Sequence, residues 1–260
     1  MSLYGRAQPG FSASRPENVM RLLLFDIDGT LINSSRIGRA ALGRALIDVF
    51  GTAGELDSYE FAGKTDRRIV HDLMAAEGFT LDQIMARVSE LDERMAVAGR
   101  ALFTPDAIRP CPGIPALLDA LSLCRDVVPA LLTGNIRHTA PLKLAAAGID
   151  PGQFRDGAYG SDSLERDELF AIALERVRES TGLRFAEEDI VVVGDTPADI
   201  RCARSGGGRA VAVATGPFST EQLTLHGPDY LFTDLAQTED VMRALLGSAE
   251  PAGEIWRERA

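Results

Sequence analysis

The sequence RLLLFDIDGT, residues 21–30, joins a short apolar run to two acidic residues, a glycine and a threonine. Such a run predicts a buried parallel strand that leads into a loop. Beyond residue 115 the same pattern returns in alternation with helical periodicity. We expect strands at 127–132, 156–160, 190–194, 210–214 and 229–232, and helices at 138–147, 168–179 and 198–204. This alternation predicts an α/β fold with a doubly wound parallel sheet and helices on both faces.

The segment between the first two predicted strands has a different character. Within 34–105 apolar residues recur at helical spacing, with turns at 51–54 and near Gly78, and no strand is expected. Proline and glycine then crowd into 105–115, which is typical of a linker. We therefore predict a loose N-terminal arm at 1–18, an α/β core made of 19–33 and 106–260, and an all-α insertion at 34–105.

The composition excludes several classes of protein. Hydrophobic residues make up 45% of the 260 residues and charged residues 25%, as in ordinary soluble domains. The net charge of −11 argues against a nucleic-acid partner, and no apolar run is long enough for a membrane span. The three cysteines form no CxxC pair, which favours a reducing cytoplasm. Nothing in the composition separates a monomer from a homodimer.

Polar residues follow each predicted strand, at the sheet edge where α/β proteins bind ligands. Asp26 and Asp28 follow the first strand, Thr133 the second, and Asp195 and Asp199 a later one. Carboxylate oxygens suit Mg²⁺, and without a cation these acids would repel one another and any phosphate. The strand ends therefore predict a site for a divalent cation, which would also supply the positive charge that an anionic substrate needs.

The DxDGT motif at 26–30, the LLTGN segment at 131–135 and the GDTPxD motif at 194–199 together resemble the haloacid dehalogenase superfamily. The resemblance runs from about residue 21 to 232, and the insertion resembles the α-helical cap of its phosphatase branch. It implies a Rossmann-like core, an Mg²⁺ cofactor and a small phosphorylated metabolite as substrate.

The same resemblance implies roles for individual residues. Asp26 would be the nucleophile that forms an aspartyl-phosphate, and Asp28 the acid and base that serves the leaving group and the water. The side chains of Asp26 and Asp195 and the backbone carbonyl of Asp28 would hold the metal. Thr133, with the amides of Gly134 and Asn135, would hold the phosphoryl oxygens.

Three residues admit two interpretations. Arg166 stands where relatives usually carry a lysine, so it either neutralises the phosphate or is a solvated surface charge. Lys143, in an apolar helix, is expected to be badly placed for that role. Asp199 either orients the metal ligands and the cation or merely caps its helix. Lys64, after a glycine between two helices, either reads the substrate or is an ordinary surface lysine.

These observations predict an Mg²⁺-dependent phosphatase. A phosphomutase shares every motif and stays open as an alternative. A dehalogenase is disfavoured by Asp28, because a halide needs no proton when it leaves. A receiver-like phospho-aspartate module and a non-catalytic binding protein belong to other classes; the length and the DxDGT arrangement argue against the first, and the missing lysine gives the second some weight.

Overall fold

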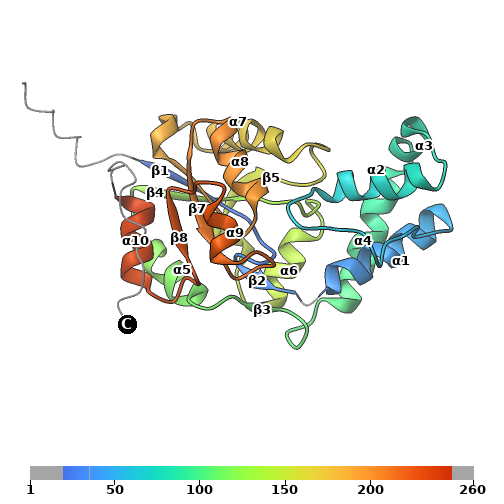
Figure 1. The fold of residues 1–260 in the computed structure, drawn as a ribbon, viewed down its shortest axis with the longest axis horizontal. Coiled ribbons are helices and arrows are strands. Elements are labelled where there is room, and N and C mark those ends of the chain that lie inside the picture. Colours follow the sequence, from blue (N-terminus) through green and yellow to red (C-terminus); the bar gives the residue numbers. More distant parts are fainter. Residues whose placement is uncertain (1–19, 35, 248–260) are drawn as a thin grey trace, which may run out of the picture.

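The computed structural model describes residues 20–34 and 36–247, so the arm expected at 1–18 lies outside the described residues. Six parallel strands form the main sheet, in the order β5-β4-β1-β6-β7-β8. Their bounds are Arg155–Ala158, Val127–Leu132, Arg21–Phe25, Ile190–Gly194, Arg209–Val213 and Tyr230–Phe232, respectively. The predicted doubly wound parallel sheet is thereby confirmed (Figure 1).

Helices cover both faces of this sheet because successive side chains of each strand point to opposite sides. Leu23 and Phe25 of β1 pack with one set of helices, and Leu22 and Leu24 pack with another. The first set comprises α5 (Ile114–Ser122), α6 (Ala140–Ala146) and α10 (Thr238–Leu246). The second comprises α7 (Leu169–Thr181), α8 (Pro197–Ser205) and α9 (Thr220–Thr224).

Residues 37–102, within the segment between β1 and β4, form a helical lobe to one side of the sheet, which we call the cap (Figure 1). It consists of α1 (Ile37–Phe50), α2 (Asp66–Ala76), α3 (Leu81–Met85) and α4 (Val88–Leu102). The cap has its own apolar core, to which Leu46, Leu73 and Leu91 belong. One member of that core, Ile136, comes from the loop after β4 rather than from the cap.

Two short strands at the base of the cap have no counterpart in the sequence prediction. β2 (Ile32–Asn33) pairs antiparallel with β3 (Arg109–Pro110), where the chain leaves the sheet for the cap and returns from it. Strands of two residues lack any periodicity that a sequence pattern could detect. Among the described residues, no helix has the length and apolar character to cross a membrane.

Candidate active site

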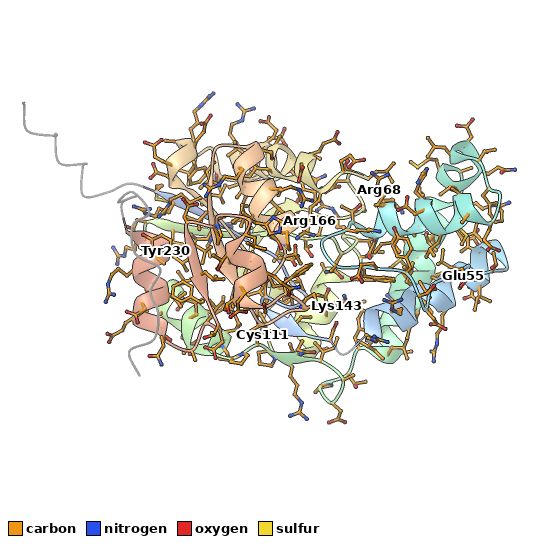
Figure 2. All side chains as sticks on the ribbon, in the orientation of Figure 1. Glu55, Arg68, Cys111, Lys143, Arg166 and Tyr230 are labelled. Carbon is orange, nitrogen blue, oxygen red and sulfur yellow. The ribbon has the colours of Figure 1, made fainter. Side chains whose placement is uncertain are left out.

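A cavity of about 620 Å³ lies between the carboxyl ends of the strands and the cap. Its core side includes Asp26, Asp28, Asn135, Arg166 and Asp195. Its cap side is lined by residues of α1, α4 and the loop before α2. Figure 2 labels Arg166 and Lys143 at the end of the core that faces the cap. The volume is ample for a small metabolite held between the two lobes.

Asp26 is the first residue beyond β1, and it is only 6% exposed. Its amide donates to the carbonyl of Val193 in the neighbouring strand over 3.0 Å, which fixes the backbone at the sheet edge. Burial raises the pKa of Asp26 to about 6, while Arg166 acts in the opposite direction. The carboxylate oxygen Oδ1 lies 3.2 Å from Nη2 of Arg166, so the buried acid has a cation beside it.

Asp195 follows β6, and its carboxylate meets those of Asp26 and Asp199. One oxygen of each of the three buried acids lies within 4.8 Å of the others. Burial and the negative charges of Asp26 and Asp199 raise the pKa of Asp195 well above its ordinary value. Three carboxylates in so small a buried volume repel one another, and a divalent cation among them would remove that repulsion.

The backbone around Asp195 leaves no space for a side chain at two positions. A β-carbon on Gly29 or on Gly216 would collide with the Asp195 carboxylate. Gly29 also has a φ of +83°, a conformation that favours glycine. Both glycines thus allow the backbone to approach the acidic cluster closely.

Arg166 is a buried residue, 6% exposed, so the surface-charge interpretation does not hold. It lies in a short 3₁₀ turn before α7, and its Nε donates to Oδ1 of Asp199 over 3.1 Å. Its Nη2 contacts both Asp199 and Asp26. Burial lowers the pKa of Arg166, but Asp199 and Asp26 outweigh burial and the net shift is upward. A permanent cation is therefore fixed beside Asp26.

Asp199 both caps the start of its helix and orients a cation, the two roles that the sequence left open. Its Oδ2 accepts hydrogen bonds from the amide and the hydroxyl of Thr196, at 3.0 and 2.7 Å, and closes a capping box at the start of α8. Its Oδ1 accepts from Arg166. Because its oxygens are engaged in this way, Asp199 orients Arg166 and is a poor candidate for a direct metal ligand.

The Asp28 carboxylate is not one of the three clustered acids, and it pairs with Lys143, which lines the cavity but does not contact Asp26. Nζ of Lys143 lies 2.6 Å from Oδ2 of Asp28. Burial raises the pKa of Asp28, but Lys143 and hydrogen bonds from Ser34 and Asn135 outweigh it and the pKa lies below its ordinary value. The site therefore holds two buried cations, each facing a different aspartate.

The Thr133–Asn135 loop follows β4 and reaches the same edge. Thr133 is fully buried, and its Oγ1 accepts from Nδ2 of Asn135 over 2.9 Å. The same amide group also donates to Oδ2 of Asp28 over 2.8 Å. A β-carbon on Gly134 would collide with the carbonyl oxygen of Lys64 and lie 3.1 Å from a guanidinium nitrogen of Arg166. The loop thus lies next to both the cap and the guanidinium group of Arg166.

Lys64 lines the cavity from the cap, in the loop before α2. Its Nζ donates to the hydroxyl of Tyr59 over 2.8 Å and lies 4.0 Å from the centre of that ring. The Tyr59 hydroxyl in turn donates to Asp72 over 2.5 Å. The side chain is therefore anchored within the cap, at the wall of the cavity.

Three residues that border the site, Ser34, Asp66 and Lys143, had no predicted role there. Asp66 is the first residue of α2, and burial raises its pKa to about 6. One signal for Lys143 was available in its neighbours. A single lysine within APLKLAA is a cation on an apolar helix, which needs a buried partner when the helix packs on a core.

Comparisons with known proteins agree with this geometry. The haloacid dehalogenase-like hydrolase model matches residues 20–207. A probable phosphatase, IndB of Dickeya dadantii, is 26% identical over 239 residues, covering 86% of this chain and 94% of that protein. A phosphoglycolate phosphatase of Pseudomonas putida is 27% identical over 252 residues, which cover 94% of this chain and 85% of that protein.

Among solved structures, a hydrolase from Pseudomonas syringae superimposes with a TM-score of 0.63 at 22% sequence identity, over 86% of this chain and 99% of that one. The two proteins therefore share the same overall fold. With the acidic motifs gathered at one sheet edge and the family model covering most of the sequence, the chain belongs to the haloacid dehalogenase-like hydrolases.

Proposed function

We propose that this protein is an Mg²⁺-dependent phosphatase that hydrolyses a small phosphate monoester through an aspartyl-phosphate on Asp26. The observation that carries the proposal is the environment of Asp26. One of its oxygens lies 3.2 Å from Arg166, and an oxygen of Asp195 and one of Asp199 lie within 4.8 Å of it. Asp26, Arg166 and Asp195 line the cavity. A carboxylate with a fixed cation and an acidic cluster beside it fits attack on a phosphoryl group.

The donor set suits Mg²⁺. Side-chain oxygens of Asp26 and Asp195 and the backbone carbonyl of Asp28 would hold the ion, and all are hard oxygen ligands. Bound there, it would draw charge from the phosphoryl oxygens and offset the repulsion among the buried acids. Asp199 supports this set through Arg166.

The residues of the chain then perform two displacements. In the first, a carboxylate oxygen of Asp26 forms a bond to phosphorus and the ester P–O bond breaks. Asp28, which takes up a proton beside the bound anionic ester, gives that proton to the leaving oxygen, and an alcohol is released. In the second, Asp28 takes a proton from water as that water attacks phosphorus. The bond to Asp26 breaks, and inorganic phosphate leaves. Arg166 and the Thr133–Asn135 loop stabilise the charge on the phosphoryl oxygens in both steps.

The relatives' names suggest probes for the substrate. Phosphoglycolate belongs in a first screen because a relative carries that activity in its name. The cavity of about 620 Å³ favours a small ester over a macromolecule. A cytoplasmic location fits the free cysteines.

The test measures hydrolysis of p-nitrophenyl phosphate and of a panel of phosphorylated metabolites, with Mg²⁺ and with EDTA. We expect turnover with Mg²⁺ only, and none from Asp26→Asn. Mg²⁺ should also raise the melting temperature of the wild type but not of Asp195→Asn, because ligand binding stabilises the folded state. Asp240→Asn, an exposed change on α10, serves as the control for both measurements.

Two results would count against this function. Activity that persists in EDTA or in Asp26→Asn would contradict the mechanism. Turnover that requires a bisphosphate activator and returns the phosphoryl group to a sugar would indicate a phosphomutase instead.

A further inference from the structure

Asp66 is an acid of the cavity wall that the proposed chemistry does not use. It is the first residue of α2, on the cap side of the cavity. It is not one of the three clustered acids at the strand ends. Burial raises its pKa to about 6, so at pH 7.5 most molecules carry an ionised carboxylate there. A carboxylate withdrawn from water needs a hydrogen-bond donor or a cation beside it.

The protein supplies a donor for one of the two carboxylate oxygens of Asp66. Oδ2 accepts a hydrogen bond from the amide of Ile136 over 3.0 Å. Within residues 20–34 and 36–247, no donor contacts Oδ1. Nor is Oδ1 among the side-chain atoms that this part of the chain seals from solvent without a partner. Oδ1 is therefore an open acceptor at the cavity wall.

The cations near Asp66 have other partners. The charge of Lys143 acts on Asp66, but its Nζ lies 2.6 Å from Oδ2 of Asp28. The charge of Arg67 acts on Asp66 as well, but its guanidinium group pairs with Asp92 inside the cap, at 2.8 Å. In the described ranges of the chain, neither cation forms an ion pair with Asp66. The open oxygen is thus left for a donor that the protein does not supply.

Apolar side chains line the cavity on the same side. Ile69 of α2 and Met95 of α4 are 2% and 3% exposed, and Phe103 directly follows α4. A ligand between core and cap would exclude water from this part of the cavity. There, a hydrogen bond to a charged acceptor distinguishes a ligand that carries the donor from one that lacks it.

The open oxygen has a fixed place relative to the loop that would bind the phosphoryl group. The amide of Asp66 donates to the carbonyl of Gly134 over 2.7 Å, and the amide of Ile136 donates to the Asp66 side chain. These two bonds join the start of α2 to the loop after β4. An acceptor held in this way selects ligands by the distance between their phosphorus and their donor.

We propose that Asp66 is a specificity-determining residue, whose Oδ1 accepts a hydrogen bond from a hydroxyl group on the alcohol part of the substrate. This inference rests on the proposed function and names its substrate class: monophosphates of alcohols that carry at least one further hydroxyl group. An ionised acceptor beside the alcohol part disfavours an ester that ends in a second acid, such as phosphoglycolate, because the two anions repel.

The experiment compares matched esters that differ in their hydroxyl groups: glycerol 1-phosphate with propyl phosphate, and glucose 6-phosphate with cyclohexylmethyl phosphate. We measure kcat/KM at pH 7.5 with saturating Mg²⁺ for the wild type, Asp66→Leu and Asp66→Asn. In at least one pair the wild type should prefer the hydroxylated ester by about 30-fold, as a hydrogen bond to a charged group provides. The preference should vanish in Asp66→Leu and fall to a few fold in Asp66→Asn, whose acceptor is neutral.

The ratio within a pair separates recognition from docking of the cap. Poorer docking of α2 would lower kcat/KM for both members of a pair and leave their ratio unchanged. Asp66→Asn keeps an acceptor for the Ile136 amide, so it carries the test even if Asp66→Leu fails to fold. Asp92→Asn is the matched control: it alters a buried acid of the cap that pairs with Arg67 and does not line the cavity. Its ratios should equal those of the wild type.

The outcomes divide as follows. A preference of about tenfold or more that is lost in Asp66→Leu or lowered in Asp66→Asn supports the inference. No preference in either pair, a preference that both variants keep, or a higher kcat/KM on phosphoglycolate than on either hydroxylated ester would overturn it.

Hydrolysis of p-nitrophenyl phosphate in the same assays reports on the proposed function alone. Its absence with Mg²⁺ would overturn that function, and the inference with it. Its presence together with equal rates within each pair would overturn only the inference.

Discussion

The main-chain amide of Asp66 donates a hydrogen bond to the carbonyl oxygen of Gly134 over 2.7 Å. The next amide of α2, that of Arg67, donates to the carbonyl of Gly160 over 3.2 Å. The first amides of a helix have no partner within the helix. Here the core supplies those partners, so the N-terminus of α2 is bound to the loops that follow β4 and β5.

The contact is reciprocal. The amide of Ile136 donates to Oδ2 of Asp66 over 3.0 Å, and the Ile136 side chain is buried among the apolar residues of the cap. The loop expected to hold the phosphoryl group is therefore built jointly by core and cap. Its geometry depends on the docking of the cap.

Gly134→Ala should disrupt this docking. A β-carbon there would collide with the Lys64 carbonyl oxygen, which is backbone and cannot rotate away. We expect the free energy of unfolding to fall by about 1–3 kcal/mol and kcat to fall at least about tenfold. Chemical denaturation and steady-state kinetics measure the two effects. In Gly152→Ala the new β-carbon would meet only the side chain of Asp150, at 3.2 Å, so this control should be nearly neutral. Equal behaviour of the two variants would contradict the argument.

The buried carboxyl group of Asp66 should make stability depend on pH. Burial raises its pKa from 3.8 to about 6, against the influence of Lys143 and the hydrogen bond from Ile136. Between these values the folded protein keeps a proton that the unfolded chain has released. The stability contributed by Asp66 therefore falls as the pH rises through this window.

Asp66→Asn keeps an acceptor without the charge and tests this linkage. The variant should gain stability relative to the wild type between pH 4 and pH 7, by about 3 kcal/mol at most. Urea unfolding at several pH values, without metal ions, measures the difference. Asp82→Asn, on the exposed face of α3, is the control and should show no such trend. A difference that stays constant with pH would rule the linkage out.

Replacing Arg166 should affect both catalysis and stability. Lysine offers one ammonium group, whereas Arg166 contacts Asp199 through both Nε and Nη2 and Asp26 through Nη2. We expect Arg166→Lys to lower kcat by about 100-fold. Arg166→Met leaves both acids without their cation and should also cost about 3–5 kcal/mol of stability in the absence of metal.

The control for Arg166 is Arg176→Met. Arg176 pairs with Asp162 at 2.5 Å in the core, and neither residue lines the cavity. This variant should lose some stability and keep its kcat. If Arg166→Met retained full activity, the role proposed for that cation would be excluded.

Lys64 offers a test of substrate recognition. Lys64→Ala should raise KM about tenfold for the metabolite found in the screen, because a hydrogen bond to a charged group is lost. Hydrolysis of p-nitrophenyl phosphate should change little. Tyr59→Phe removes only the hydroxyl that holds Nζ, at 2.8 Å, and should give a smaller rise. An equal loss on both esters would reject a role in recognition.

Sequence alone placed the acidic cluster because the rule behind it is geometric. Asp26 and Asp195 directly follow strands that pair in parallel, so their carboxylates share one edge of the sheet. Thr133 follows the strand on the other side of β1 and arrives there for the same reason. Strand ends that are far apart in sequence thus become neighbours as soon as the strand order is known.

The contacts that could not be predicted from sequence depend on how far a side chain extends and on where backbone atoms lie. Lys143 was judged from its helix, but its long side chain, from the middle of α6, brings Nζ to within 2.6 Å of Asp28 in another segment. The docking of Asp66 on Gly134 uses backbone atoms, which leave no signature in residue types. The buried contact of Arg166 likewise needed the relative placement of α7 and α8.

Ile136 also bears on how a reaction product escapes. It is 1% exposed and belongs to the apolar core of the opposite lobe. A movement of the cap away from the core that opens the cavity must withdraw the Ile136 side chain from the apolar core of the cap. Its exposure to water would cost about 2 kcal/mol. Release of phosphate by such a movement would then carry the cost of exposing this side chain, in addition to the cost of breaking the hydrogen bonds from Asp66 and Arg67 to the core.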